Sequence, residues 1–167
     1  MRCYFSTSAL LLGAFLVMPL HAHTELAVNK QTRSSAPVVE SARQSALETQ
    51  KSCMQHVQMN VFEFEECISD RLKLKKLSAA ERLGITYMGF VGALSAQRMG
   101  SQGSHMMAWD YAKKSFKIQK KLGLKDSELC DLVPGDCETR IARTALILNG
   151  PAPAPLTEAE MTNRHRH

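Results

Sequence analysis

The chain has 167 residues, with 21 Lys and Arg, 16 Asp and Glu, and a formal net charge of +5 at pH 7. This length supplies one domain with one buried core and excludes an ordinary two-domain protein. The excess of positive charge is mild, so it allows weak attraction to an anionic surface but does not define a site for a polyanion.

Residues 1–22 have the layout of a secretory signal peptide. Arg2 supplies a positive charge, an apolar run extends from residue 9 to residue 17, and Ala22 is a small residue at the best cleavage position. The apolar run is shorter than the ~20 residues of a membrane-spanning helix, which makes a permanent anchor the less favoured alternative. We therefore expect a periplasmic or secreted protein, and export makes nucleic acid a poor candidate as a partner.

Polar residues 23–36 follow the predicted signal peptide, and we expect them to form a flexible segment. Residues 37–150 predict one α-helical domain. Apolar positions recur there at helical spacing, and no stretch alternates as a strand would. The indicated helices lie near 38–59, 61–77, 79–99, 106–122 and 137–149.

Local signals mark several helix boundaries. Ser78 and Glu81 form the clearest capping box, which starts the third predicted helix. The last predicted helix carries one apolar face, made by Ile141, Ala145 and Leu148. Alternating Pro and Ala begin residues 151–167, which we expect to be a mobile tail.

Four cysteines follow the predicted signal peptide, and an even number in an exported chain indicates two disulfides. Asn60 and Glu63 can form a capping box midway between Cys53 and Cys67, which would set these two cysteines side by side on antiparallel helices. The turn at Pro134 lets the other two close a short loop. These spacings favour the pairs Cys53–Cys67 and Cys130–Cys137.

A different pairing follows if residues 53–67 form one continuous helix, because each cysteine would then need a distant partner. Metal or redox chemistry is disfavoured, since the chain has no Cys-x-x-Cys motif. The predicted fold is therefore an all-α bundle of about five helices, stapled by two disulfides.

Leu83, Gly84 and Tyr87 resemble the first-helix signature of a tetratricopeptide repeat, and the sequence from Ala108 onward resembles the second helix. The resemblance covers residues 80–122. It implies a hairpin in which the glycine admits the second helix and the tyrosine fills the gap between the pair. The packing positions would be Leu83, Gly84, Tyr87, Ala108, Tyr111 and Ala112.

The chain departs from that family in three ways. The stretch 98–105 lengthens the unit beyond the 34-residue period, no proline stands at Lys120, and no second copy of the pattern is present. A solenoid needs at least three units. We therefore expect one repeat-like hairpin inside a small bundle.

Three glycines, Gly84, Gly89 and Gly92, lie inside the first helix of this hairpin. Each weakens a helix by up to ~1 kcal/mol relative to alanine, so together they indicate close approach of a neighbouring element. We expect that neighbour to be the helix at 106–122, which offers a matching apolar stripe. The alternative is that the glycines face a bound ligand or peptide.

No motif for catalysis is present: the chain has no Gly-x-Ser-x-Gly, no His-Glu-x-x-His and no phosphate loop. We therefore expect neither an enzyme nor a cofactor.

Lysines cluster on the helix at 106–122, and we expect a helical adaptor of the bacterial envelope that binds another exported protein there. The predicted partner-binding residues are Lys113, Lys114, Lys117, Lys120 and Lys121.

The alternative from another class is a periplasmic carrier of copper, nickel or a small ligand. Imidazole and thioether groups are donors that such metals accept, and cleavage after Ala22 would leave a histidine as the first residue. The candidate ligands are His23, His56, Met59 and His105.

Overall fold

The computed structural model describes residues 35–58 and 60–158. These residues form α-helices and one short 3-10 helix and contain no strand, so the prediction of an all-α fold is confirmed. The predicted signal peptide, nearly all of segment 23–36 and the end of the predicted tail lie outside the described residues. The elements are α1 (Ala36–Val57), α2 (Val61–Lys73), α3 (Ala79–Arg98), α4 (Ser104–Leu122), α5 (Asp126–Leu129), η1 (Cys130–Leu132) and α6 (Cys137–Asn149).

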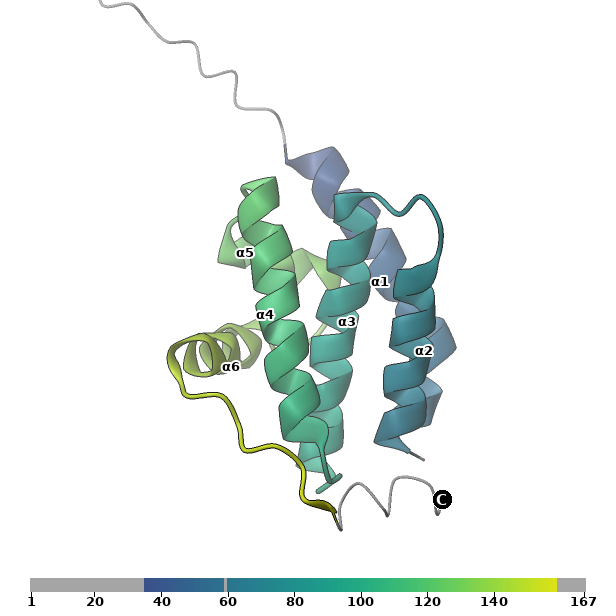
Figure 1. Ribbon diagram of the computed structural model, residues 1–167. Helices are drawn as coiled ribbons and strands as arrows, with labels where there is room; N and C mark the ends of the chain where they lie inside the picture. Colours follow the sequence, from purple (N-terminus) through teal and green to yellow (C-terminus); the bar gives the residue numbers. More distant parts are fainter. Residues whose placement is uncertain (1–34, 59, 159–167) are drawn as a thin grey trace, which may run out of the picture. The chain divides into compact units, whose positions relative to one another are not determined.

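Helix α3 is the centre of the bundle. It lies between α2 and α4, with α1 packed behind, and it contacts all three (Figure 1). Most of its residues are buried, from Ala80 to Ala96, which explains why it is apolar on every side rather than along one stripe. Burial in a protein core accounts for this apolar character, and none of the described helices combines the length and hydropathy needed to cross a bilayer.

The predicted starts of α2 and α3 are confirmed. The Asn60 side chain accepts a hydrogen bond from the Phe62 backbone N–H at 2.9 Å and begins α2. Ser78 and Glu81 form the reciprocal capping box of α3, with bonds of 2.7 and 3.2 Å. The proposed role of Glu63 in a capping box was wrong, because its carboxylate contacts His56 at 3.3 Å instead.

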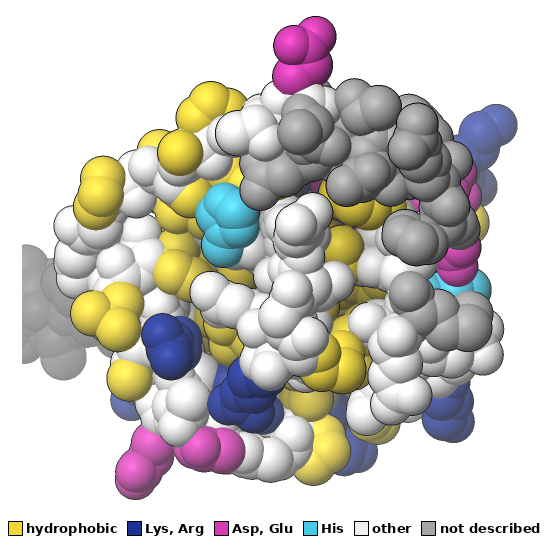
Figure 2. Space-filling model, turned by 90° about the horizontal axis from the view of Figure 1, so that it is seen from below, with side chains coloured by type: hydrophobic (Ala, Val, Ile, Leu, Met, Phe, Trp, Pro, Cys, Tyr) yellow, Lys and Arg dark blue, Asp and Glu magenta, His cyan; other side chains and the backbone are white. Residues whose placement is uncertain are grey.

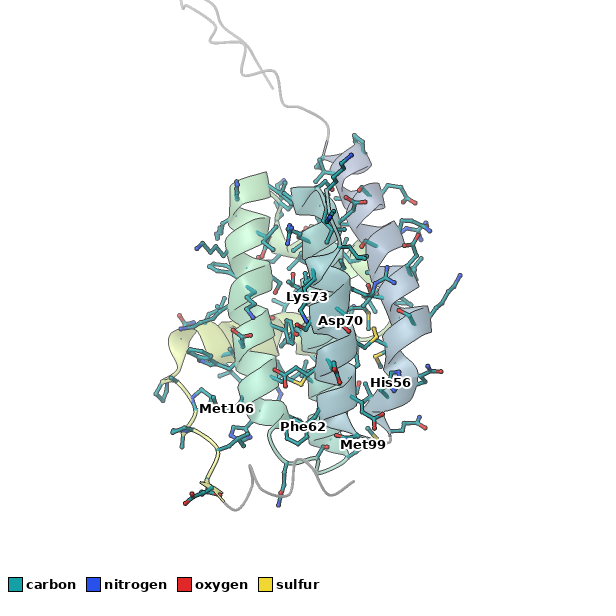
Figure 3. The ribbon with its side chains drawn as sticks, turned by 45° about the vertical axis from the view of Figure 1, so that its right-hand side comes forward. His56, Phe62, Asp70, Lys73, Met99 and Met106 are labelled. Carbon is teal, nitrogen blue, oxygen red and sulfur yellow. A yellow bond between two sulfur atoms is a disulfide. The ribbon has the colours of Figure 1, made fainter. Side chains whose placement is uncertain are left out.

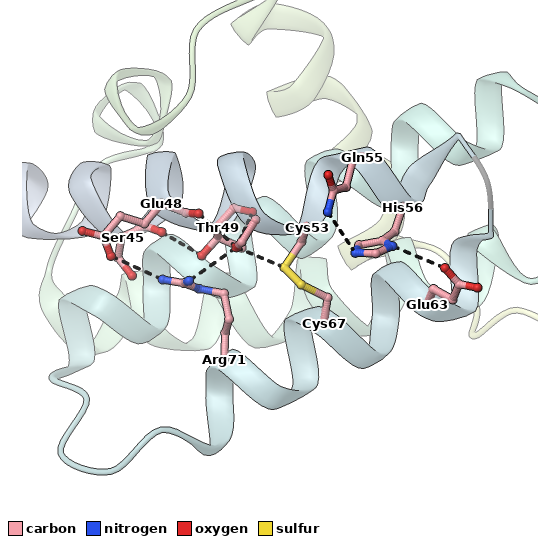
Figure 4. The surroundings of a disulfide bond; sticks show 10 residues. Ser45, Glu48, Thr49, Cys53, Gln55, His56, Glu63, Cys67 and Arg71 are labelled. Atoms are coloured by element: carbon pink, nitrogen blue, oxygen red, sulfur yellow. Dashed lines mark hydrogen bonds and ion pairs between the residues drawn. A yellow bond between two sulfur atoms is a disulfide. The ribbon is translucent and has the colours of Figure 1, made fainter.

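The two disulfides join the predicted pairs. Cys53 on α1 bonds to Cys67 on α2 with 5.7 Å between their Cα atoms, and Cys130 bonds to Cys137 with 5.3 Å. Figure 4 shows the first bond lying between the two antiparallel helices. The alternative of one continuous helix from 53 to 67 is wrong, because the chain reverses direction between α1 and α2. Disulfides persist in oxidising compartments outside the cytoplasm, which is where this covalent framework belongs.

The closest helix approach differs from the prediction. A Cβ atom added at Gly84 would lie 2.1 Å from the Ala42 carbonyl oxygen and 2.9 Å from the Ala46 backbone nitrogen, both on α1. Gly84 therefore admits α1, and the implication from the repeat-like resemblance that it admits the second helix of the hairpin was wrong. The physical reason is that α3 has neighbours on three sides, and sequence spacing does not say which neighbour meets which face.

The other two glycines of α3 also serve different neighbours. At Gly89 an added Cβ would lie 2.9 Å from the Tyr111 ring of α4, and at Gly92 it would lie 2.1 Å from the Phe64 ring of α2. The prediction that α4 faces these glycines holds for Gly89 alone. All three are filled by protein, so the alternative of a ligand or peptide against them was also wrong.

Candidate binding groove

Helix α6 buries little of itself against the bundle. Arg140 is its only buried residue, and Leu146 is 67% exposed. The helix runs across the direction of the long helices, beside α4 (Figure 1). Seen from below, hydrophobic side chains are scattered over the lower end of the molecule in small groups, with Lys and Arg side chains among them (Figure 2). The bundle therefore covers the apolar side chains of α6 only in part.

The apolar face predicted for this helix lines a groove instead of packing into the core. The groove has a volume of about 560 Å³, within the usual range of ligand-binding clefts. Helix α4 forms one wall, α5 forms one end and α6 forms the other wall. Its lining residues are Tyr87, Lys113, Phe116, Asp126, Leu129, Ile141, Thr144, Ala145, Leu148 and Asn149.

A buried arginine holds α6 in place beside this groove. Arg140 donates through Nε to the Tyr87 hydroxyl at 3.2 Å and through its other nitrogens to the carbonyl oxygens of Val133 at 2.8 Å and Pro134 at 3.1 Å. No carboxylate of the described residues lies within ion-pair distance of this guanidinium. Its three acceptors are neutral, and its positive charge is one of the causes that lower the pKa of the Asp136 carboxyl.

The floor of the groove carries a neutral hydroxyl. Tyr87 is 2% exposed, and this burial raises the pKa of its hydroxyl, although the charge and hydrogen bond of Arg140 oppose the shift. The phenol is therefore protonated at neutral pH. The acid at the α5 end, Asp126, accepts a hydrogen bond from the Gln119 amide at 2.7 Å.

The five lysines predicted to bind a partner all lie exposed on α4. Lys113 lines the groove and holds its Nζ atom 4.2 Å from the centre of the Trp109 ring, and the Nζ atom of Lys120 lies 5.1 Å from the centre of the Phe116 ring. Lys114 pairs with Asp110. Within the described residues no carboxylate pairs with the remaining two, Lys117 and Lys121. The wall formed by α4 is therefore basic along its outer edge.

The predicted packing positions of the hairpin are buried, so they form core rather than a contact surface. They are Leu83, Gly84, Tyr87, Ala108, Tyr111 and Ala112. Tyr87 is the one member of this set that also lines the groove, where it forms the floor.

The candidate metal ligands are not brought together. His56 lies near the end of α1 and contacts Glu63 on α2 at 3.3 Å (Figures 3 and 4). His105 lines a different hollow, beside Trp109 and the segment after α6. His23 and Met59 lie outside the described residues. Within the described part of the chain, no group of three His, Cys, Asp or Glu side chains could hold a metal ion.

No pattern in the sequence indicated that α5 or Phe116 would line a groove. Helix α5 is a single turn, too short to produce a periodic pattern, and Phe116 reads as one more apolar position on α4. The face of Ile141, Ala145 and Leu148 was visible as a pattern, but nothing local distinguishes an uncovered face from a packed one.

Comparison of the chain with protein-family models, with curated proteins and with solved structures finds no match. The geometry of the groove therefore carries the functional argument.

Proposed function

We propose that this protein is a non-catalytic binding module of the bacterial envelope that holds an apolar segment of another exported protein. The observation that carries the proposal is the groove between α4 and α6, whose apolar lining the described chain leaves partly uncovered. Grooves of this kind between helices are a common way of gripping the apolar face of a peptide segment. The predicted signal peptide and the two disulfides support an exported location.

The lining has the composition of a binding surface rather than of a catalytic site. Phe116, Leu129, Ile141 and Leu148 supply apolar area. The polar side chains among them are those of Tyr87, Lys113, Asp126, Thr144 and Asn149. Such a surface gains free energy when apolar side chains of a partner displace water from it, by roughly 25 cal/mol per Å² buried. The metal-carrier alternative has no comparable support, because no arrangement of the described ligand candidates favours it.

Site-specific photo-crosslinking in the producing cell tests this function. A photoreactive residue replaces Ala145, which lines the groove, and in a matched control it replaces Ala142, which is exposed on the same helix outside the groove. We expect a single protein partner to be crosslinked from position 145 and not from position 142. Ala145→Glu should abolish co-purification of that partner. Equal crosslinking from both positions, or none from position 145, would contradict the proposal.

A further inference from the structure

We propose that Asn149 is a site of spontaneous deamidation, a reaction that turns one side chain of the α4–α6 groove from a neutral amide into a carboxylate. The effect of this change on a partner rests on the proposed function, whereas the modification itself does not. Three features of the chain support it: the residue that follows Asn149, the freedom of the two reacting groups, and the open end of α6.

The residue after Asn149 offers little hindrance to this reaction. Deamidation begins when the backbone nitrogen of the following residue attacks the side-chain carbon of an asparagine. The chain has four asparagines, and Asn149 is the one that precedes a glycine, Gly150, which has no Cβ atom to obstruct the attack. Asn60, by contrast, precedes the β-branched Val61.

The reaction balances with water as its only co-reactant. The Gly150 nitrogen forms a bond to Cγ of Asn149, the Cγ–Nδ2 bond breaks, and the amide nitrogen leaves as ammonia with the proton that the backbone nitrogen has lost. Water then opens the resulting succinimide ring at either carbonyl carbon. The product is aspartate or isoaspartate, and at neutral pH either one adds a negative charge.

Both reacting groups are free of competing hydrogen bonds. The Asn149 side chain is exposed, and within the described chain its amide makes no hydrogen bond and the Gly150 N–H donates to no acceptor. At the ends of α3 and α4, the backbone N–H groups of Met99 and Gly123 bond back to the preceding turn instead. Asn60 also differs, because its Oδ1 atom accepts a hydrogen bond from the backbone of α2.

The end of α6 is held weakly enough to reach the reactive geometry. Asn149 is the last residue of this helix, so the final turn must open to bring its Cγ atom to the Gly150 nitrogen. Gly150 is extended, with φ −87° and ψ 167°, and Pro151 has no N–H with which to close the turn. Leu146, in the same turn, is 67% exposed. A helix end with so few contacts opens at low free energy.

The product places its charge in the wall of the groove. The lining has one acid, Asp126, and one base, Lys113, so a carboxylate at position 149 leaves it with an excess of negative charge. A partner that covers this wall must remove water from the new carboxylate, which costs free energy. The new charge also lies at the C-terminal end of α6, where the helix dipole disfavours it. We therefore expect the modified protein to bind its partner more weakly.

Incubation of the purified exported protein at neutral pH tests the modification. Mass spectrometry of proteolytic peptides and enzymatic methylation of isoaspartate follow the reaction at each asparagine, with a synthetic peptide of residues 144–154 as the reference. We expect the folded protein to react at Asn149 within about threefold of the peptide rate, since frayed ends open at a free energy near zero. Asn60 should remain intact over the same period.

Two results would overturn the modification. One is a rate at Asn149 more than about tenfold below that of the peptide, which would show that the fold protects this site. The other is formation of an acidic species by Asn149→Gln at the rate of the wild type, because this variant keeps an amide but cannot form the five-membered ring.

The effect on the groove is tested separately with Asn149→Asp, which carries the charge of the product, and Asn149→Gln, which stays neutral. We expect Asn149→Asp to lower crosslinking of the partner from position 145 by about tenfold and Asn149→Gln to retain it. Equal crosslinking in both variants would overturn the effect on the groove. Deamidation at Asn149 without any crosslinked partner would support the modification and contradict the proposed function alone.

Discussion

Gly84 shows how much of the packing in this bundle depends on single atoms. Its missing Cβ leaves room for the backbone of α1 at Ala42, and rigid backbone atoms on both sides prevent either helix from yielding easily. The tolerance of a position of this kind to substitution is set by the neighbour that a new methyl group would meet.

Replacing Gly84 by Ala should destabilise the protein strongly. The added Cβ would lie 2.1 Å from the Ala42 carbonyl oxygen, so α1 and α3 must separate. We expect a loss of at least about 2 kcal/mol in the free energy of unfolding, measured by urea denaturation, despite the better helix propensity of alanine. Gly89→Ala is the comparison: its methyl group meets the Tyr111 ring at 2.9 Å, which is a side chain rather than backbone, so it should lose less. A Gly84→Ala variant as stable as the wild type would contradict this account.

Glu81 should contribute stability in a pH-dependent way. Hydrogen bonds from the Ser78 backbone and side chain hold the pKa of Glu81 below its ordinary value. A carboxyl whose pKa is lowered by folding stabilises the protein above the ordinary carboxyl range, and this contribution is lost as pH falls through the folded-state pKa. The wild type should therefore have a higher urea midpoint than Glu81→Gln at pH 7, and the two should converge in acid.

The control for that pH dependence is Glu66→Gln, which removes the same charge from an exposed position on α2. Its difference from the wild type should not follow the titration of Glu81 as observed by NMR. A constant difference between Glu81→Gln and the wild type from pH 7 to acid would show that the cap does not depend on ionisation.

At the scale of elements, α6 differs from α1, α2, α3 and α4 in how it is held. Those helices share one hydrophobic core, whereas α6 depends on the Arg140 hydrogen bonds, the Cys130–Cys137 bond and the partly buried Ile147. An element with few buried contacts opens locally at lower free energy than the core does. The geometry of the groove therefore rests on a small number of interactions.

Removing the Cys130–Cys137 disulfide should loosen α6 without unfolding the bundle. In Cys130→Ser with Cys137→Ser, we expect amide hydrogens of α6 to exchange faster while those of α3 stay protected. Removing the other disulfide, with Cys53→Ser and Cys67→Ser, should instead lower the stability of the whole bundle by about 3 kcal/mol, because it closes a loop of this size between two core helices. Uniform exchange changes in both variants would contradict the separate behaviour of α6.

At the scale of the whole described molecule, the segment after α6 returns across the end of the bundle. Pro151 and Pro153 line a hollow with Trp109 and Leu94, and the Leu156 side chain approaches Gly103 (Figure 1). The C-terminal segment thus covers part of Trp109, the residue whose ring lies beneath the Nζ atom of Lys113.

Ending the chain after Gly150 should expose Trp109 to water. We expect its fluorescence emission to shift to longer wavelength, with a loss of stability of about 1 kcal/mol or less, because only a few partly buried residues are removed. Substituting Leu156 by Ala in the full chain should give a smaller shift. Unchanged emission after truncation would show that the segment does not cover the ring in solution.

Much of the fold could be predicted from local signals. The capping residues Asn60 and Ser78 begin helices where expected, and the spacing of the cysteines around Asn60 indicated the correct disulfide. The short α5 turn and the early end of α2 at Lys73 were not predicted, since a single turn has no periodicity and the sequence beyond Lys73 continues to favour a helix.

The candidate site was predicted only in part. The lysines of α4 were recognised as exposed charge, but the groove beside them was not, because it exists only where α4, α5 and α6 meet. The arginine that sets one wall of the groove bonds to a tyrosine 53 residues away in the chain. No local pattern reports such a contact.

The sequence by itself determined the five longer helices, the residues that cap the starts of α2 and α3, the covalent framework and the oxidising compartment that it requires, because each depends on residues within one or two turns of each other or on simple spacing. Tertiary structure decided which neighbour each glycine of α3 admits and whether the apolar face of α6 is covered. Both depend on how distant segments pack, and packing selects among faces that look alike in sequence. The functional proposal depends on this second kind of information, since the groove is a face of α6 that the described bundle leaves open.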